Sequence, residues 1–182
     1  MYLDSSAVRK PIGILMIEHR LIERALNALE ARINSPGSPP DVIAFAELID
    51  FFGTYADATH HGKEEDILFI EADSVKLSDE LTAVLAQLRD DHVRFRGYRR
   101  AMNEANRKLA AGNKAALNDL ISTAKEFIPR LRQHIVKEDK VFFPGFDKLQ
   151  QKADRDKMKA AFYAFDAERI HETYKAVVDR NE

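Results

Sequence analysis

The segment HHGKEEDILF, residues 60–69, recurs later in the chain as HIVKEDKVFF, residues 134–143. Both segments have His at the first position, Lys at the fourth, Glu at the fifth and an acidic residue at the sixth, and both end in Phe. Residues four apart lie on one face of a helix, about one turn apart, so each segment directs an imidazole and a carboxylate the same way. Two such His-x-x-x-Glu pairs facing each other supply half of a two-metal carboxylate site inside a helical bundle.

The composition indicates a soluble globular protein. The chain has 182 residues, of which 45% are hydrophobic and 32% charged, which predicts a single domain over residues 1–182 and excludes a disordered chain. Its net charge of −2 gives no reason to expect a nucleic-acid partner. No apolar run approaches the roughly 18 residues of a membrane span, and residues 13–17 are too few for a signal-peptide core. We therefore expect a cytoplasmic protein without a membrane partner.

Four segments carry apolar residues at alternating spacings of three and four, the pattern of helices packed in a bundle. The first begins at Pro11, a favoured first-turn residue, and is stopped by the Pro-, Gly- and Ser-rich residues 34–40. Asp41 and Ser78 are the predicted N-caps of the second and third helices. Pro129 lies inside the fourth helix, where it removes a hydrogen bond or introduces a kink; the sequence leaves this open.

Polar residues interrupt each of these apolar seams. In chain order they are His19, His60, Glu64, His92, His134 and Glu138. Short connections favour an all-α, up-down-up-down four-helix bundle over about residues 11–144, with an additional C-terminal helix over about residues 154–180. In that topology the six polar side chains fall at about the same level, nearer one end of the bundle. The sequence therefore predicts a single site.

Burying these histidines and glutamates is costly unless they are paired or bind a cation. A single His in an apolar seam is more often a core residue hydrogen-bonded to the backbone, but six such residues at one level favour a metal. The chain has no Cys, which excludes thiolate ligands and disulfides. Imidazole and carboxylate ligands suit iron, with manganese or zinc as lesser alternatives. Six ligands suit two ions bridged by the Glu pair better than one ion with open positions.

The ordered motifs resemble those of the hemerythrin-like, HHE cation-binding domain family. The matching pieces, from about Pro11 to Pro144, are Glu18-His19-Arg20, His60-x-x-x-Glu64, Asp91-His92 and His134-x-x-x-Glu138, with the Leu-Phe and Phe-Phe-Pro ends. The last helix is also similar to family members that carry a C-terminal His. The resemblance implies a non-haem di-iron centre, bridged by carboxylates and an oxo or hydroxo group. The implied ligands are His19, His60, Glu64, His92, His134 and Glu138.

One position departs from the oxygen-carrying members of the family. Those proteins have a His-x-x-x-His on the third helix, whereas here Leu88 stands four residues before His92. One His ligand fewer would leave the second iron more open. This departure argues against a simple reversible oxygen carrier and favours reactive chemistry or sensing.

Further residues are candidates for additional metal ligands or for partners of the ligands. His61 follows His60, but neighbouring helix residues point about 100° apart, and the alignment of the two segments selects His60 as the ligand. His61, Glu65 and Asp139 are therefore better placed to flank or orient the ligands. Counted from the start of the last helix, His171 lies about as many residues along it as the candidate ligands lie along theirs. The sequence leaves open whether it binds metal or packs at an interface.

The resemblance leaves several functions open. The first is the handling or sensing of oxygen, peroxide or nitric oxide by the di-iron centre; no catalytic residue can be assigned, and enzymatic activity is undecided. The second is an iron-binding, redox-sensing or storage module without catalysis. The third is a helical bundle in which a metal, most simply zinc, only stabilises the fold.

Overall fold

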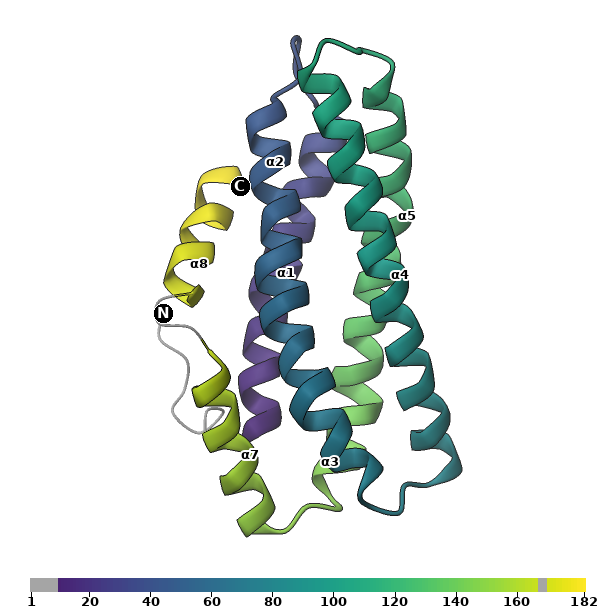
Figure 1. Cartoon of the computed structure of the whole chain (residues 1–182), viewed down its shortest axis with the longest axis vertical. Helices are drawn as coiled ribbons and strands as arrows, with labels where there is room; N and C mark the ends of the chain where they lie inside the picture. Colours follow the sequence, from purple (N-terminus) through teal and green to yellow (C-terminus); the bar gives the residue numbers. More distant parts are fainter. Residues whose placement is uncertain (1–9, 167–169) are drawn as a thin grey trace.

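Long helical rods run side by side and form a bundle (Figure 1). The computed structural model describes residues 10–166 and 170–182, and within them it contains helices and no strand, so the predicted all-α fold is confirmed. Two of the rods are single helices, α1 and α4, and the other two are each built from several helical segments. The rods are α1 (Pro11–Asn34), the rod from α2 (Val42–Phe51) to α3 (Phe69–Asp73), α4 (Asp79–Ala110), and the rod from α5 (Ala116–Lys137) to α6 (Phe143–Asp147).

The two composite rods change their winding near the candidate site. Their middle segments are π-helical, with i→i+5 hydrogen bonds in place of the regular i→i+4 pattern. Such segments are rare and frequently occur at functional sites. A regular helical periodicity, such as the sequence shows, does not predict them. The π segments are η2 (Phe52–His61), η3 (Glu64–Leu68) and η4 (Glu138–Phe142).

The predicted helix ends are confirmed where the sequence supplies a cap. α1 begins at Pro11, and the side chains of Asp41 and Ser78 each accept a hydrogen bond from a backbone N–H in the first turn of α2 and α4. Gly112 follows α4 with a φ of +94°, a left-handed conformation that favours glycine. Pro129 is exposed on α5, which continues through it without a break.

The predicted single C-terminal helix is wrong, because the structure has two helices there, α7 (Lys152–Phe165) and α8 (Ile170–Asn181). Asp166 leaves α7 with an extended backbone, at φ −68° and ψ 126°, and its side chain bonds to the bundle. Figure 1 shows both helices, α7 in yellow-green and α8 in yellow, along one side of the bundle. The apolar residues of these two helices are therefore divided between two packing surfaces, with Phe162 of α7 in one core cluster and Val177 of α8 in the other.

The core consists of two apolar clusters with a polar band between them. On α1, His19 lies between Leu15 of one cluster and Ile22 of the other. On α4, His92 likewise lies between the clusters, which contain Leu88 and Phe95 respectively. The rods are thus held together by apolar packing on both sides of the polar residues, which fixes these residues at a common level.

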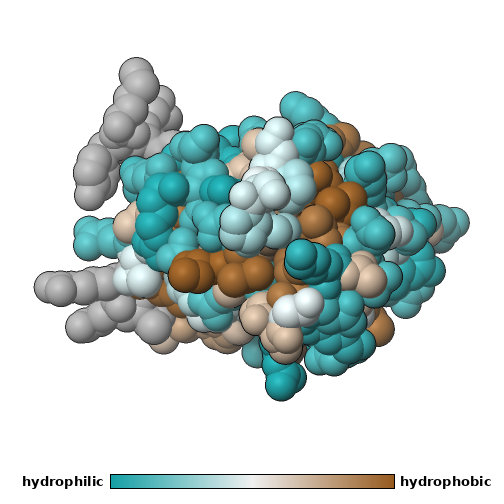
Figure 2. Space-filling view, turned by 90° about the horizontal axis from the view of Figure 1, so that it is seen from above, coloured by the Kyte–Doolittle hydropathy of each residue, from teal (hydrophilic) through white to brown (hydrophobic). Residues whose placement is uncertain are grey.

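The outer surface at the end of the bundle is mostly hydrophilic. Figure 2 shows this end, where hydrophobic residues, in brown, form a central band and smaller patches between hydrophilic ones. No helix within residues 10–166 and 170–182 is both long and apolar enough to cross a membrane.

Candidate metal centre

Two groups of buried ligand-type side chains meet in the polar band, and Glu64 belongs to both. Within each group, the nitrogen and oxygen atoms that could bind a metal lie within 4.8 Å of one another. The structure therefore brings together the six residues implied by the family resemblance and adds His61 to them. The first group is His19, His60, Glu64 and Glu138, and the second group is His61, Glu64, His92 and His134.

The two glutamates connect these groups. Glu64 Oε1 lies 3.4 Å from His60 Nε2, and Glu64 Oε2 lies 3.4 Å from His92 Nε2. Glu138 is placed in the same way, with its two oxygens each 3.2 Å from the Nε2 atom of one imidazole in each group. Each carboxylate therefore directs one oxygen to the first group and the other oxygen to the second group, as a carboxylate that bridges two ions would.

Each imidazole of the two groups has its Nδ1 atom facing a carboxylate, which leaves Nε2 to face the site. Carboxylate partners of this kind orient metal-binding histidines and select the tautomer. Glu65 and Asp139 therefore contact the imidazoles, as expected for residues that orient ligands. The pairs are His19 with Asp139 (2.8 Å), His60 with Glu18 (2.9 Å), His61 with Asp57 (3.6 Å), His92 with Glu65 (2.7 Å) and His134 with Asp91 (3.5 Å).

The repeated sequence segments make equivalent contacts in the two halves of the bundle. In each, the Lys at the fourth position bonds to the carboxylate that faces the first-position His: Lys63 Nζ lies 2.5 Å from Glu18, and Lys137 Nζ lies 2.7 Å from Asp91. The acidic residue at the sixth position faces the His of a neighbouring helix. These roles of Lys63 and Lys137 were missed from the sequence, although the repeat of the Lys was the signal for them.

His61 faces the site, which differs from the expectation for a regular helix. It is the last residue of η2, where the looser winding reduces the angle between neighbouring side chains. His60 and His61 can therefore both point inward, one into each group. Leu88 lies in an apolar cluster instead, so the third imidazole of the second group comes from His61 on η2 and not from position 88 on α4.

Several buried atoms that face the site have no hydrogen-bond partner within the described part of the chain. They include Nε2 of His19 and of His60, and both carboxylate oxygens of Glu64 and of Glu138. Buried polar atoms are normally paired, and a cation would satisfy these atoms together. Imidazole nitrogen and carboxylate oxygen without thiolate fit ions such as iron, manganese or zinc. The residues present therefore fit a metal.

The two glutamates differ in their electrostatics. Burial, followed by the charge of Glu138, raises the pKa of Glu64 well above its ordinary value. Burial acts on Glu138 in the same direction, but His134 and His19 outweigh it and lower the pKa of Glu138. Burial also lowers the pKa of His61 to about 3. This imidazole is therefore neutral near pH 7, the form in which His binds a metal.

A further cluster of candidate ligand atoms, from Glu18, Asp166 and His171, lies beside the first group. Lys63 Nζ is 2.5 Å from Glu18 Oε1 and 2.6 Å from Asp166 Oδ1, so an ammonium group already supplies the positive charge there. His171 is 3.0 Å from the hydroxyl of Tyr55 and 3.1 Å from Asp166 Oδ2. The structure thus places His171 in this cluster and outside both ligand groups.

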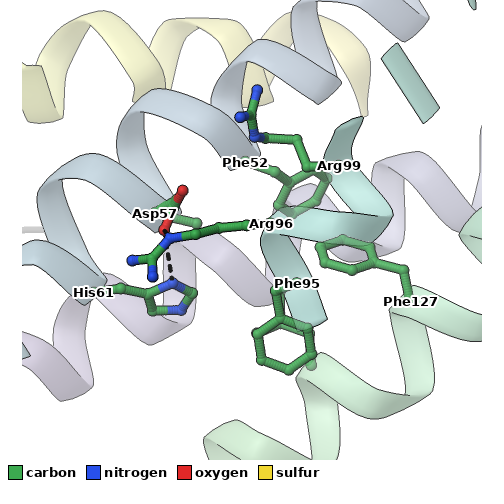
Figure 3. Close-up of a pocket in the computed structure, with 9 residues that line it drawn as sticks. Phe52, Asp57, His61, Phe95, Arg96, Arg99 and Phe127 are labelled. Atoms are coloured by element: carbon green, nitrogen blue, oxygen red, sulfur yellow. Dashed lines mark hydrogen bonds and ion pairs between the residues drawn. The ribbon is translucent and has the colours of Figure 1, made fainter. Parts of the chain in front are cut away.

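A small pocket reaches the second group from the surface between η2, α4 and α5. Figure 3 shows phenylalanine rings around it, with His61 on one side and Arg96 reaching toward Asp57. Its volume is about 10 Å³, roughly the space of one water molecule. Arg96 bonds to both Asp57 and Glu65 at 2.8 Å, the carboxylates that face His61 and His92. The pocket therefore joins the second group to a partly exposed ion pair.

The comparison with protein families gives one match. The hemerythrin HHE cation binding domain matches residues 10–146, a range that contains both ligand groups and leaves α7 and α8 outside. No curated protein and no solved structure matches the chain. Cation binding by the buried His and Glu residues is thus supported by the family match and by the geometry.

Proposed function

We propose that this chain, which belongs to the hemerythrin HHE cation-binding domain family, binds two metal ions side by side in its buried centre. The observation that carries the proposal is the placement of Glu64 and Glu138, whose oxygens lie 3.2–3.4 Å from the Nε2 atoms of both groups. Ligand atoms that share one ion at bond lengths of about 2.0–2.2 Å lie about 3 Å apart. The spacing therefore suits one ion in each group, with both carboxylates between them.

The donor atoms favour iron. Imidazole and carboxylate without thiolate suit this metal, with manganese or zinc as lesser alternatives. A di-iron pair would supply redox chemistry toward a small ligand such as oxygen, peroxide or nitric oxide. We infer that the protein handles or senses a ligand of this size, because every member of both groups is buried, which leaves no room for a large ligand beside either ion.

The chain's own residues would make the two ions unequal. The first group has two imidazoles and the second group has three, so an ion in the first group keeps more positions for a small ligand. Carboxylates hydrogen-bonded at Nδ1 hold His19, His60 and His92 with Nε2 facing inward. The apolar clusters on both sides exclude water from the bridging carboxylates. Ligand binding is therefore expected to favour one ion over the other.

The first test is the metal content of protein purified without added metal, with absorption spectra before and after exposure to oxygen. We expect about two irons per chain and a near-ultraviolet band of a bridged di-iron centre that changes with oxygen. Glu64→Gln, which alters a bridging carboxylate, should lose metal. Glu65→Gln weakens the contacts with His92 Nδ1 and with Arg96 but removes no ligand oxygen, so it is the matched comparison and should retain more metal than Glu64→Gln.

Other outcomes would assign other functions. One zinc per chain, or no stoichiometric metal with a featureless spectrum, would contradict the di-iron proposal and favour a structural metal or none. Peroxide turnover no faster than that of free iron, in fully loaded protein, would assign the centre to binding, sensing or storage without catalysis.

A further inference from the structure

The C-terminal segment, described over residues 147–166 and 170–182, lies outside the family match yet packs against the bundle beside the first group. Met158 and Phe162 of α7 belong to one apolar cluster of the core, and Val177 and Val178 of α8 belong to the other. The segment therefore spans the polar band from one cluster to the other. Asp166 stands between its two helices, at the level of that band.

A continuous chain of polar contacts leads from this segment to a candidate ligand. Asp166 Oδ1 lies 2.6 Å from Lys63 Nζ, and Lys63 Nζ lies 2.5 Å from Glu18 Oε1. The other oxygen of Glu18 lies 2.9 Å from Nδ1 of His60. His171 bonds to the second oxygen of Asp166 at 3.1 Å and so fixes its orientation. The position of the His60 ring is thereby tied to that of Asp166.

The other half of the bundle lacks this connection. Lys137 bonds to Asp91, which faces His134, and no residue of the described C-terminal segment bonds to Lys137. The side chain of Lys137 is 31% exposed, whereas that of Lys63 is 0% exposed. Both halves therefore contain the same Lys–carboxylate–His arrangement. Among the described residues, the C-terminal segment covers and bonds to the arrangement of Lys63 and not to that of Lys137.

Direct packing also joins the segment to the helix that carries the ligands. A Cβ atom added at Gly62 would lie 2.8 Å from Cζ of Phe165, closer than such atoms approach in proteins. The backbone at Gly62 is right-handed helical, so the space taken by Phe165 is what calls for glycine there. Gly97, a half-buried residue of α4, has nothing within 4 Å of the same added atom.

We propose that Asp166 is a positioning residue for the first group: through Lys63 and Glu18 it fixes the imidazole of His60, so that docking of the C-terminal segment controls how firmly the metal ion there is held. Without Asp166, Glu18 is the one carboxylate left close to Lys63 among the described residues, and Lys63 draws it away from His60 Nδ1. The contact between Asp166 and Lys63 therefore governs how fast the ion of the first group is released. This part of the inference rests on the proposed metal binding. The positioning of His60 itself does not require a metal.

The first experiment uses the metal-free, full-length protein and follows the imidazole nitrogens of His60 and His134 by nitrogen NMR. In Asp166→Asn, the Nδ1 proton of His60 should exchange with water faster and its nitrogen signals should shift, while those of His134 stay unchanged. Asp156→Asn removes the same charge from an exposed site on α7 and should change neither. Unchanged His60 signals, or equal changes in both histidines, would overturn the proposal.

The second experiment measures the release of metal to a chelator. In Asp166→Asn and in Gly62→Ala, one of the two ions should leave about 10-fold faster or more, while the other leaves at the wild-type rate. Gly97→Ala is the matched glycine control and should behave as wild type. Equal acceleration of both ions, or none, would contradict control by the C-terminal segment. If the wild type holds no metal, the proposed function fails, and the NMR result alone decides the positioning role.

Discussion

His61 stacks on His92, with ring centroids 4.0 Å apart and 16° between the ring planes. The two residues come from different rods, η2 and α4, and both contribute a nitrogen to the second group. A regular helix would turn His61 away from this group. The stacking therefore shows that the π-helical segment and the ligand set are parts of one arrangement.

Replacing His61 should weaken metal binding in the second group alone. We expect His61→Ala to retain metal in the first group and to lose, or bind about 10–100-fold more weakly, the ion of the second group. Metal titration followed by elemental analysis measures both the number of ions and their affinity. His171→Ala removes an imidazole outside both groups, so it serves as the control for the second group and should bind that ion with wild-type affinity. Two ions bound with wild-type affinity in His61→Ala would show that this imidazole is not a ligand.

Replacing the second bridging residue should affect both ions. Glu138→Gln keeps the shape of the side chain but removes the charge that faces His19 and His134. We expect the number of bound ions to fall for both groups together, because each loses a carboxylate oxygen. Asp139→Asn alters the residue that faces His19 Nδ1 and pairs with Arg20, but no ligand of the second group, so it should leave the second ion in place. Loss of a single ion in Glu138→Gln would mean that Glu138 does not bridge.

Lys63 should be important for the stability of the metal-free protein. It is fully buried between Glu18 and Asp166, and Lys63→Met would leave both carboxylates without their counter-charge. Breaking a buried ion pair in this way costs about 3–5 kcal/mol, measured as the free energy of unfolding in denaturant. Lys137→Met removes the equivalent, partly exposed residue and should cost about 0–1 kcal/mol. Equal losses in the two variants would contradict the difference in burial.

Metal uptake should release protons at neutral pH. Burial opposes the charge of His19, but hydrogen bonds to Asp139 and Glu138 outweigh it and raise its pKa to about 9, so the metal-free site carries a proton there at pH 7. Burial also raises the pKa of Glu64. A metal must displace such protons, so apparent affinity should fall as pH falls, by about tenfold per pH unit for each proton displaced. Calorimetry in buffers of different ionisation enthalpy measures the release, and affinity that is constant from pH 9 to pH 6 would contradict it.

The apolar spacing of three and four predicted the rods, and the polar residues in those seams predicted which side chains would meet. Both patterns are local, because a helix places residues three and four apart on one face whatever surrounds it. Asp41, Ser78 and Gly112 act at helix ends through their own backbone neighbours, so these boundaries could be predicted too. The single helix predicted for residues 154–180 failed because Asp166 leaves the helix to bond with Lys63, 103 residues away in the chain.

The sequence by itself determined the helical bundle, the repeated His-x-x-x-Glu pairs and the six residues that gather in the polar band, since each follows from spacing along a helix. Only the tertiary structure decided the inward turn of His61, the two-sided placement of Glu64 and Glu138, and the attachment of Asp166 to the first group. These features depend on the local winding of η2 and on contacts between distant segments. A periodic sequence pattern predicts neither the winding of η2 nor these distant contacts, because both arise when the rods pack around buried charges that must be paired.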